Sequence, residues 1–157
     1  FIMLIVAGFG WAKPVQFNEM NLRNPRTDVI KIAIAGPLSN AVIAMILSVI
    51  LAIISRSVPN NYSPGMQITT EVFRYAIFIN WGLFIFNLIP LPPLDGSHLL
   101  FSQLKRFPSV YEGLYKYSSY LLFGLVIATM LTKINFLPIG PAIEFFYRGF
   151  FSFIGYS

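Results

Sequence analysis

One carboxylate lies in the apolar stretch Phe86–Leu100, which reads "FNLIPLPPLDGSHLL". Asp95 is the acidic residue of this run, and it follows three prolines and precedes Gly96. Proline removes backbone donors and interrupts regular helix, whereas glycine admits backbone angles that other residues avoid. Ionisable side chains at membrane depth are costly and usually face a cavity or a partner. The pattern therefore predicts a carboxylate held at an opening, where it is suited to bind a metal ion such as Zn2+.

The same residues also allow a plainer role for Asp95. "PLPPLDGS" also reads as a simple loop, in which Asp95 caps a helix that begins near Ser97. A metal site needs further ligands, and the sequence holds one histidine, His98. His98 stands at i+3 from Asp95, but an ordinary hydrogen-bonded histidine in a first helical turn is the favoured interpretation. The remaining glutamates at span edges are expected to be solvated: Glu71, Glu112 and Glu144.

Asn87 precedes Asp95 by eight residues and lies among apolar neighbours in "FIFNLIP". A buried amide must find hydrogen-bond partners. It could satisfy carbonyl groups freed by Pro90 and Pro92, or it could donate to a bound peptide or oxyanion.

A second polar position, Asn40, lies in "AGPLSNAVIA". Gly36 and Pro37 in this stretch are expected to kink a helix and to allow close approach of a neighbour. The stretch is interpreted as a packing surface first, with Asn40 as a supporting polar contact.

The composition indicates a membrane protein. The 157 residues are 56% hydrophobic and 11% charged, whereas soluble domains carry about 25% charge. The absence of cysteine excludes disulfides, thiolate metal sites and cysteine nucleophiles within this sequence. The net charge of +5 comes from residues that flank apolar runs, which favours membrane orientation over binding of nucleic acid.

The apolar runs predict an all-α integral membrane protein that forms one membrane domain over residues 1–157. Three transmembrane helices are expected, with a partial apolar segment before them and a short apolar helix after them. The expected spans are 32–54, 75–94 and 117–132. The segment 136–156 is expected to form either a final short span or an interfacial helix. In the last segment Glu144 and Arg148 stand at i and i+4 and could pair. The sequence opens on the apolar "FIMLIVAGFG" without Met, so a fragment is expected.

Charge counting predicts the orientation in the membrane. Two spans separate the connecting segments 10–31 and 105–116, so both segments lie on the same side of the membrane. Together they carry more Lys and Arg than the opposite side, which includes the loop 56–70. The positive-inside rule therefore makes 10–31 and 105–116 cytoplasmic. Within the first of them, "GFGWAKPVQF" at 8–17 is either an extended segment able to pair with a substrate strand or an interfacial anchor.

Four pieces of the sequence resemble the site-2 protease family of intramembrane zinc metalloproteases. They are "NLIPLPPLDG" at 87–96, "AGPLSN" at 35–40, "FGWAKPV" at 9–15 and "NLRNPRTD" at 21–28. The resemblance implies that Asp95 is the third zinc ligand and that Asn87 contacts substrate or the tetrahedral intermediate. The family's other two ligands and its general base come from an H-E-x-x-H helix, which this sequence lacks, and His98 matches no family ligand.

The implied protein is an intramembrane zinc metalloendopeptidase of the cell membrane that cuts membrane-anchored proteins and binds one zinc ion per full-length chain. Because the H-E-x-x-H helix lies upstream in the family, truncation is the expected reason for its absence, and the 157 residues alone are expected to be inactive. One alternative is an inactive homologue that acts as a membrane scaffold or assembly partner. A small transporter that uses Asp95 as an ion site is ranked last.

Overall fold

Most of the residues that the structure describes are helical. The computed structural model describes residues 24–57, 63–104, 107–132, 136 and 138–155, so the segment 8–17 lies outside the described residues. The helices are α2 (Pro25–Ser57), α3 (Pro64–Asn87), α4 (Ser97–Leu104), α5 (Pro108–Thr132) and α6 (Ile139–Phe153). No strand occurs in these residues, which confirms the expected all-α class.

Three helices begin inside segments that the sequence analysis expects to be connections between spans. α2, α3 and α5 begin at Pro25, Pro64 and Pro108, so the segments 25–31, 64–70 and 108–116 are helical. Proline suits the first helical turn because its missing N–H would have no partner there. At α3 the backbone N–H of Met66 donates to the Ser63 hydroxyl at 3.4 Å, which caps the helix. Each of these three prolines therefore starts a helix inside a segment that the sequence analysis expects to be a connection.

The predicted span 75–94 is wrong at its carboxyl end. α3 ends at Asn87, and the residues after it form turns as far as Gly96. Pro90, Pro92 and Pro93 lie in that segment, and each removes the N–H that a continuing helix would use. We call residues 87–96 the 87–96 turn.

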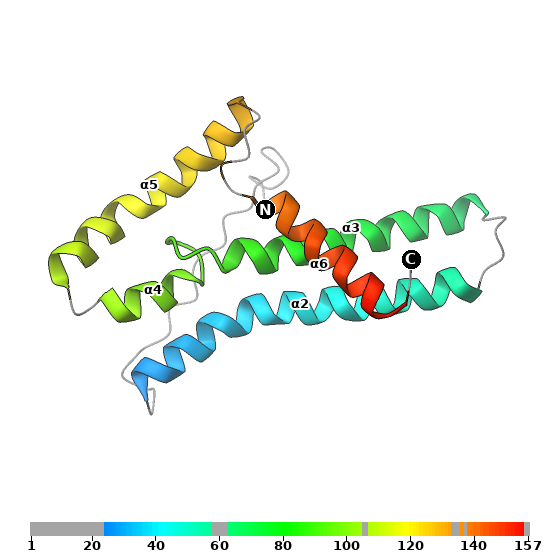
Figure 1. Ribbon diagram of the computed structural model, residues 1–157, viewed down its shortest axis with the longest axis horizontal. Helices are drawn as coiled ribbons and strands as arrows, with labels where there is room; N and C mark the ends of the chain where they lie inside the picture. The colour runs from blue at the N-terminus through cyan, green and yellow to red at the C-terminus, as the bar shows by residue number, and fades with distance from the viewer. Residues whose placement is uncertain (1–23, 58–62, 105–106, 133–135, 137, 156–157) are drawn as a thin grey trace.

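The centre of the molecule is a three-helix packing of α2, α3 and α6. α2 and α3 run antiparallel side by side, and α6 lies across them, whereas α5 stands apart and is joined through α4 (Figure 1). Gly82 of α3 lets α6 come close, because a Cβ there would lie 3.3 Å from the Cδ1 atom of Ile143. The buried core of these helices consists of Ala41, Ala44, Leu51, Ile77, Trp81, Ile143 and Phe151.

α6 is held at its middle and at its end. At its middle the Phe146 ring stacks on Trp81 at a centroid distance of 5.1 Å. At its end the Arg56 guanidinium of α2 donates to the carbonyl oxygen of Gly155 at 2.7 Å. The expected pair of Glu144 and Arg148 is confirmed at 2.8 Å. The tail is thus a helix docked on the bundle, and its crossing of the membrane stays a prediction.

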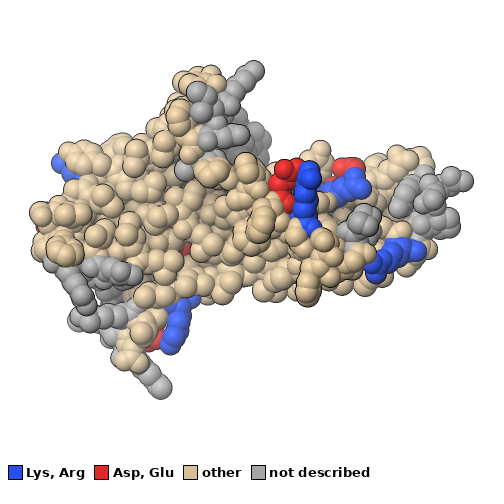
Figure 2. All heavy atoms as spheres, viewed as in Figure 1, with Lys and Arg blue, Asp and Glu red and all other residues tan. Residues whose placement is uncertain are grey.

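Many exposed side chains of the described helices are large and apolar. Among the described residues, α2 is the candidate membrane span, since Thr27–Ser57 is long and apolar enough to cross a bilayer. Its side chains include Ile46 and Ile53, which are 53% and 60% exposed. Charged side chains cover little of the face in Figure 2. This surface suits contact with lipid, while the predicted number of three spans is not confirmed.

The core predicts a large effect of Ile77→Ala on stability. Ile77 is fully buried against the other core residues, so truncation should lower the free energy of unfolding by ~2–5 kcal/mol. Ile79→Ala is the matched control, because Ile79 lies on the same helix and is 56% exposed. The midpoint of thermal unfolding in detergent measures both. Equal shifts for the two variants would contradict the packing described here.

Candidate functional site

A backbone hydrogen bond closes the 87–96 turn on itself. The Gly96 N–H donates to the carbonyl oxygen of Asn87 at 2.7 Å. A Cβ atom at Gly96 would collide with the carbonyl of Leu88 and lie 2.8 Å from the carbonyl oxygen of Ile89. Backbone atoms cannot move aside as a side chain can, so this closure requires glycine. It brings the two ends of the turn, Asn87 and the Asp95–Gly96 pair, to one place.

The interior of the turn is ordered by further hydrogen bonds. The Leu94 N–H donates to the carbonyl oxygen of Leu91, and the Ser97 N–H donates to that of Leu94, each at 3.0 Å. From α5, the Ser119 hydroxyl donates to the carbonyl oxygen of Pro92 at 3.2 Å. Asp95 therefore extends from a backbone that is fixed from within and from a neighbouring helix.

The Asp95 side chain packs on α2. Its Oδ2 atom lies 2.7 Å from the position that a Cβ atom of Gly36 would occupy. Asp95 is half-buried. Gly36 follows Lys31 by five residues, which places it roughly 7 Å along the helix into the uncharged run. The carboxylate thus sits against the backbone of the candidate membrane span, inside its apolar part.

The Asp95 carboxylate accepts no hydrogen bond from any of the described residues. The backbone carbonyl of Asp95 accepts from the His98 N–H at 3.1 Å, but the side chain does not bond to the first turn of α4. The described residues therefore offer no hydrogen bond in support of the alternative role as a helix cap. Buried carboxylates are ordinarily paired or bound to metal. A half-buried carboxylate with no partner in the described chain fits the donor chemistry of a zinc ligand.

Two amides belong to the segments that meet at this carboxylate. Asn87 is half-buried at the end of α3, and Asn40 is half-buried on α2. Asn40 follows Gly36 by four residues, so both occupy the same face of the helix. Neither amide makes a side-chain hydrogen bond within the described parts of the chain. One of the two roles considered for Asn87, bonding to carbonyls freed by prolines, is therefore not seen in these parts.

The other candidate ligands lie elsewhere. His98 is exposed on α4. Glu71 and Glu144 are exposed and pair with Arg74 and Arg148 on their own helices, while Glu112 is exposed on α5. No group of three His, Cys, Asp or Glu residues able to hold a metal ion occurs among the residues that the structure describes.

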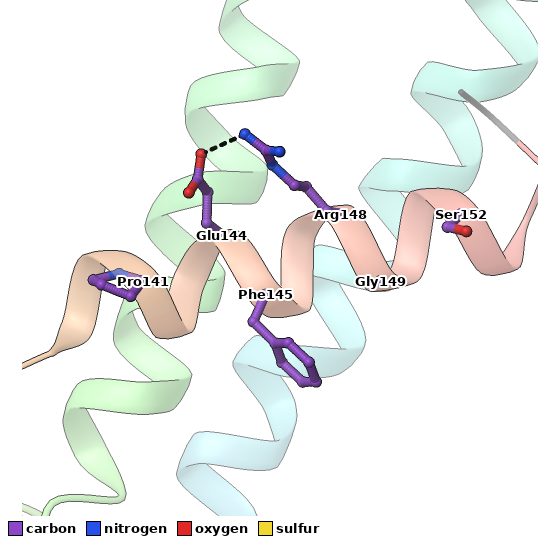
Figure 3. Close-up of a pocket in the computed structure, with 6 residues that line it drawn as sticks. All are labelled: Pro141, Glu144, Phe145, Arg148, Gly149 and Ser152. Carbon is purple, nitrogen blue, oxygen red and sulfur yellow. Dashed lines mark hydrogen bonds and ion pairs between the residues drawn. The ribbon is translucent and has the colours of Figure 1, made fainter.

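A shallow hollow on α6 is separate from this arrangement. Figure 3 shows it along the outer side of the helix, beside the Glu144–Arg148 ion pair. None of its lining residues comes from the 87–96 turn or from α2. They are Pro141, Glu144, Phe145, Arg148, Gly149 and Ser152.

The closure of the turn predicts that Gly96→Ala is strongly destabilising. The added methyl group would meet backbone carbonyls, so either the Gly96–Asn87 hydrogen bond breaks or the turn shifts, at a cost of about 1–3 kcal/mol. Gly113→Ala is the control, because a Cβ there meets nothing within 4 Å. Thermal unfolding in detergent compares them. A Gly96 variant as stable as the control would contradict the described closure.

Comparisons with known proteins bear on the same segment. Residues 57–116 match "Peptidase family M50". The Bacillus subtilis protein "Putative zinc metalloprotease YwhC" is 38% identical over 102 residues, which make up 63% of this chain and 45% of the relative. The Methanocaldococcus jannaschii protein "Putative zinc metalloprotease MJ0611" is 33% identical over 70 residues, which make up 45% of this chain and 32% of the relative.

The chain therefore covers less than half the length of each of these relatives. No solved structure matches it. The matched family segment contains Asn87, Asp95 and the whole turn between them. The resemblance of this chain to the site-2 proteases, the peptidases of family M50, is thereby confirmed.

Proposed function

We propose that this chain forms part of an intramembrane zinc metalloendopeptidase that hydrolyses peptide bonds of membrane-anchored proteins. The observation that carries the proposal is the Asp95 carboxylate. It is half-buried, has no hydrogen-bond partner among the described residues, and lies against Gly36 within the apolar part of α2. The M50 match and the names of the two relatives support a metalloprotease at the level of the family.

Asp95 is proposed to be one ligand of a single zinc ion. The closed turn holds the Asp95 backbone in place, and α2 limits the positions open to the carboxylate. The remaining ligands are proposed to come from outside these 157 residues, because the sequence has one histidine and the described residues hold no group of three His, Cys, Asp or Glu able to bind a metal ion. A zinc ion supplies Lewis-acid activation and a bound water whose pKa is lowered to about 7.

Asn87 is proposed to bind the substrate. Its amide is half-buried and free of hydrogen bonds to the described residues, and its backbone is joined to Gly96 next to Asp95. An amide N–H placed there can donate to the carbonyl oxygen of a peptide bond that lies beside Asp95, and this bond strengthens as negative charge develops on that oxygen.

The proposed setting is a multi-pass protein of the cell membrane, with the segments 10–31 and 105–116 in the cytoplasm. The apolar α2 and the exposed apolar side chains support contact with lipid. The Lys and Arg residues of the two segments support the orientation. The Asp95 carboxylate would then lie toward the cytoplasmic side. A substrate helix must unwind to present its peptide bond there, because helical carbonyls are already hydrogen-bonded.

Zinc content tests the role of Asp95. The intact gene product, purified in detergent, should contain one zinc ion per chain, and Asp95→Ala should remove or strongly weaken that binding. Glu112→Ala is the control, since Glu112 is exposed on α5, and it should keep the metal. Stoichiometric zinc in the Asp95 variant would remove this residue from the site, and a wild-type protein without zinc would refute the proposed function.

The role of Asn87 predicts a loss of turnover with the metal retained. Asn87→Ala should lower kcat by about 10²–10³-fold, the usual cost of one donor to a developing oxyanion, at unchanged zinc content. Asn80→Ala is the matched control on the same helix, because the Asn80 amide donates to the carbonyl oxygen of Ala76 at 2.8 Å. Cleavage of a membrane-anchored reporter protein measures the effect. Equal activity of the two variants would exclude Asn87 from substrate binding.

A further inference from the structure

We propose that Gly36 is a positioning residue for Asp95: the bare backbone of α2 at Gly36 is the surface that sets the direction of the Asp95 carboxylate toward the metal. This inference rests on the proposed function, because it assigns Gly36 a role at the same site. Gly36 donates no ligand atom. It acts because its missing side chain leaves room for the Asp95 carboxylate.

The first argument is the distance. Oδ2 of Asp95 lies 2.7 Å from where a Cβ of Gly36 would stand, and its Cγ lies 3.6 Å away. Real Cβ atoms essentially never approach another heavy atom to within 3.0 Å. Any side chain at position 36 would therefore force this oxygen to move.

The second argument is what can move in response. The backbone on either side of Asp95 is tied by the Gly96–Asn87 and His98–Asp95 hydrogen bonds, at 2.7 and 3.1 Å. The carboxylate, by contrast, is the free end of a short side chain with two rotatable bonds. A methyl group on Gly36 would thus turn the carboxylate and leave the turn in place. Metal ligands tolerate displacements of only about 0.2 Å, so the metal would be affected before the fold.

The third argument is the position of this glycine in a helix. Glycine in a helix interior is unfavourable relative to alanine, and α2 extends well beyond Gly36 on both sides. Other glycines of the described helices would accept a Cβ into open space, among them Gly113 and Gly124. Gly36 differs because of the carboxylate that rests on it, which is a physical reason for a glycine there.

The main test compares Gly36→Ala with Gly124→Ala in the intact gene product. Both changes add one methyl group to a helix, but a Cβ at Gly124 meets nothing within 4 Å. Both variants should unfold at or above the wild-type midpoint, because alanine favours helix. Gly36→Ala alone should bind zinc more weakly, by about 10–100-fold, the usual effect of disturbing a residue that orients a ligand. Its Co2+-substituted form should show an altered visible absorption spectrum, which a purely structural change far from the metal would not produce.

A second measurement tests the contact without any metal. The 157 residues contain no cysteine, so the pair Gly36→Cys and Asp95→Cys introduces the two thiols of this stretch. Disulfides need Cβ atoms about 3.5–4.5 Å apart, and the described contact should let this pair cross-link on mild oxidation. The pair Gly124→Cys and Asp95→Cys should not, since a Cβ at Gly124 has no neighbour within 4 Å.

The outcomes separate the two proposals. Weaker metal binding and a changed Co2+ spectrum in Gly36→Ala, with a cross-link at 36 and 95, support the positioning role. Wild-type metal binding and spectrum in Gly36→Ala overturn that role and leave Asp95 as a ligand. Failure of the 36–95 pair to cross-link overturns the contact itself. A wild-type protein that binds no metal refutes the proposed function and the inference together.

Discussion

The hydrogen bond from the Gly96 N–H to the Asn87 carbonyl is the interaction on which the site depends. It follows the end of α3, closes a turn that is rich in prolines, and ties the backbone next to Asp95. Without it the prolines would leave a segment with few donors of its own and many possible conformations. With it, Asn87 and Asp95 share one location although eight residues separate them in sequence. The glycine is part of the same interaction, since no other residue fits beneath the Leu88 carbonyl.

The helix packing supplies the second side of the site. The antiparallel arrangement of α2 and α3 brings the end of α3 beside the first half of α2, where Gly36 lies (Figure 1). α6 holds the two helices together through Trp81 and Phe146 and through the bonds from Arg56. α5 reaches the turn through Ser119. The position of one carboxylate thus depends on helices from most of the described chain.

Much of the site could be predicted from the sequence, because local rules govern it. Prolines and a glycine around Asp95 predicted irregular backbone in an apolar run, and the structure places a turn there. The same rule failed at Pro25, Pro64 and Pro108, since proline interrupts a helix from within but suits its first turn. Whether a proline starts or interrupts a helix depends on which residues can continue the helix in the packed structure.

The contact between Gly36 and Asp95 could not be predicted in the same way. "AGPLSN" indicated close packing at Gly36, but the neighbour was expected to be a helix, and it is a carboxylate from a distant turn. Only the packing of α2 against the segment after α3 determines that neighbour. The number of membrane spans could not be predicted for a similar reason. α3 carries side chains with polar groups, such as Asn80 and Trp81, and their hydropathy alone does not say whether lipid or protein surrounds them.

The most direct test of a metal site at this turn is an experimental structure of the intact gene product with anomalous diffraction collected at the zinc edge. We predict one anomalous peak about 2.0–2.2 Å from a carboxylate oxygen of Asp95, with that carboxylate resting on the backbone of Gly36. A peak bound elsewhere, or an Asp95 carboxylate turned away from Gly36 and engaged by the first turn of α4, would contradict the account.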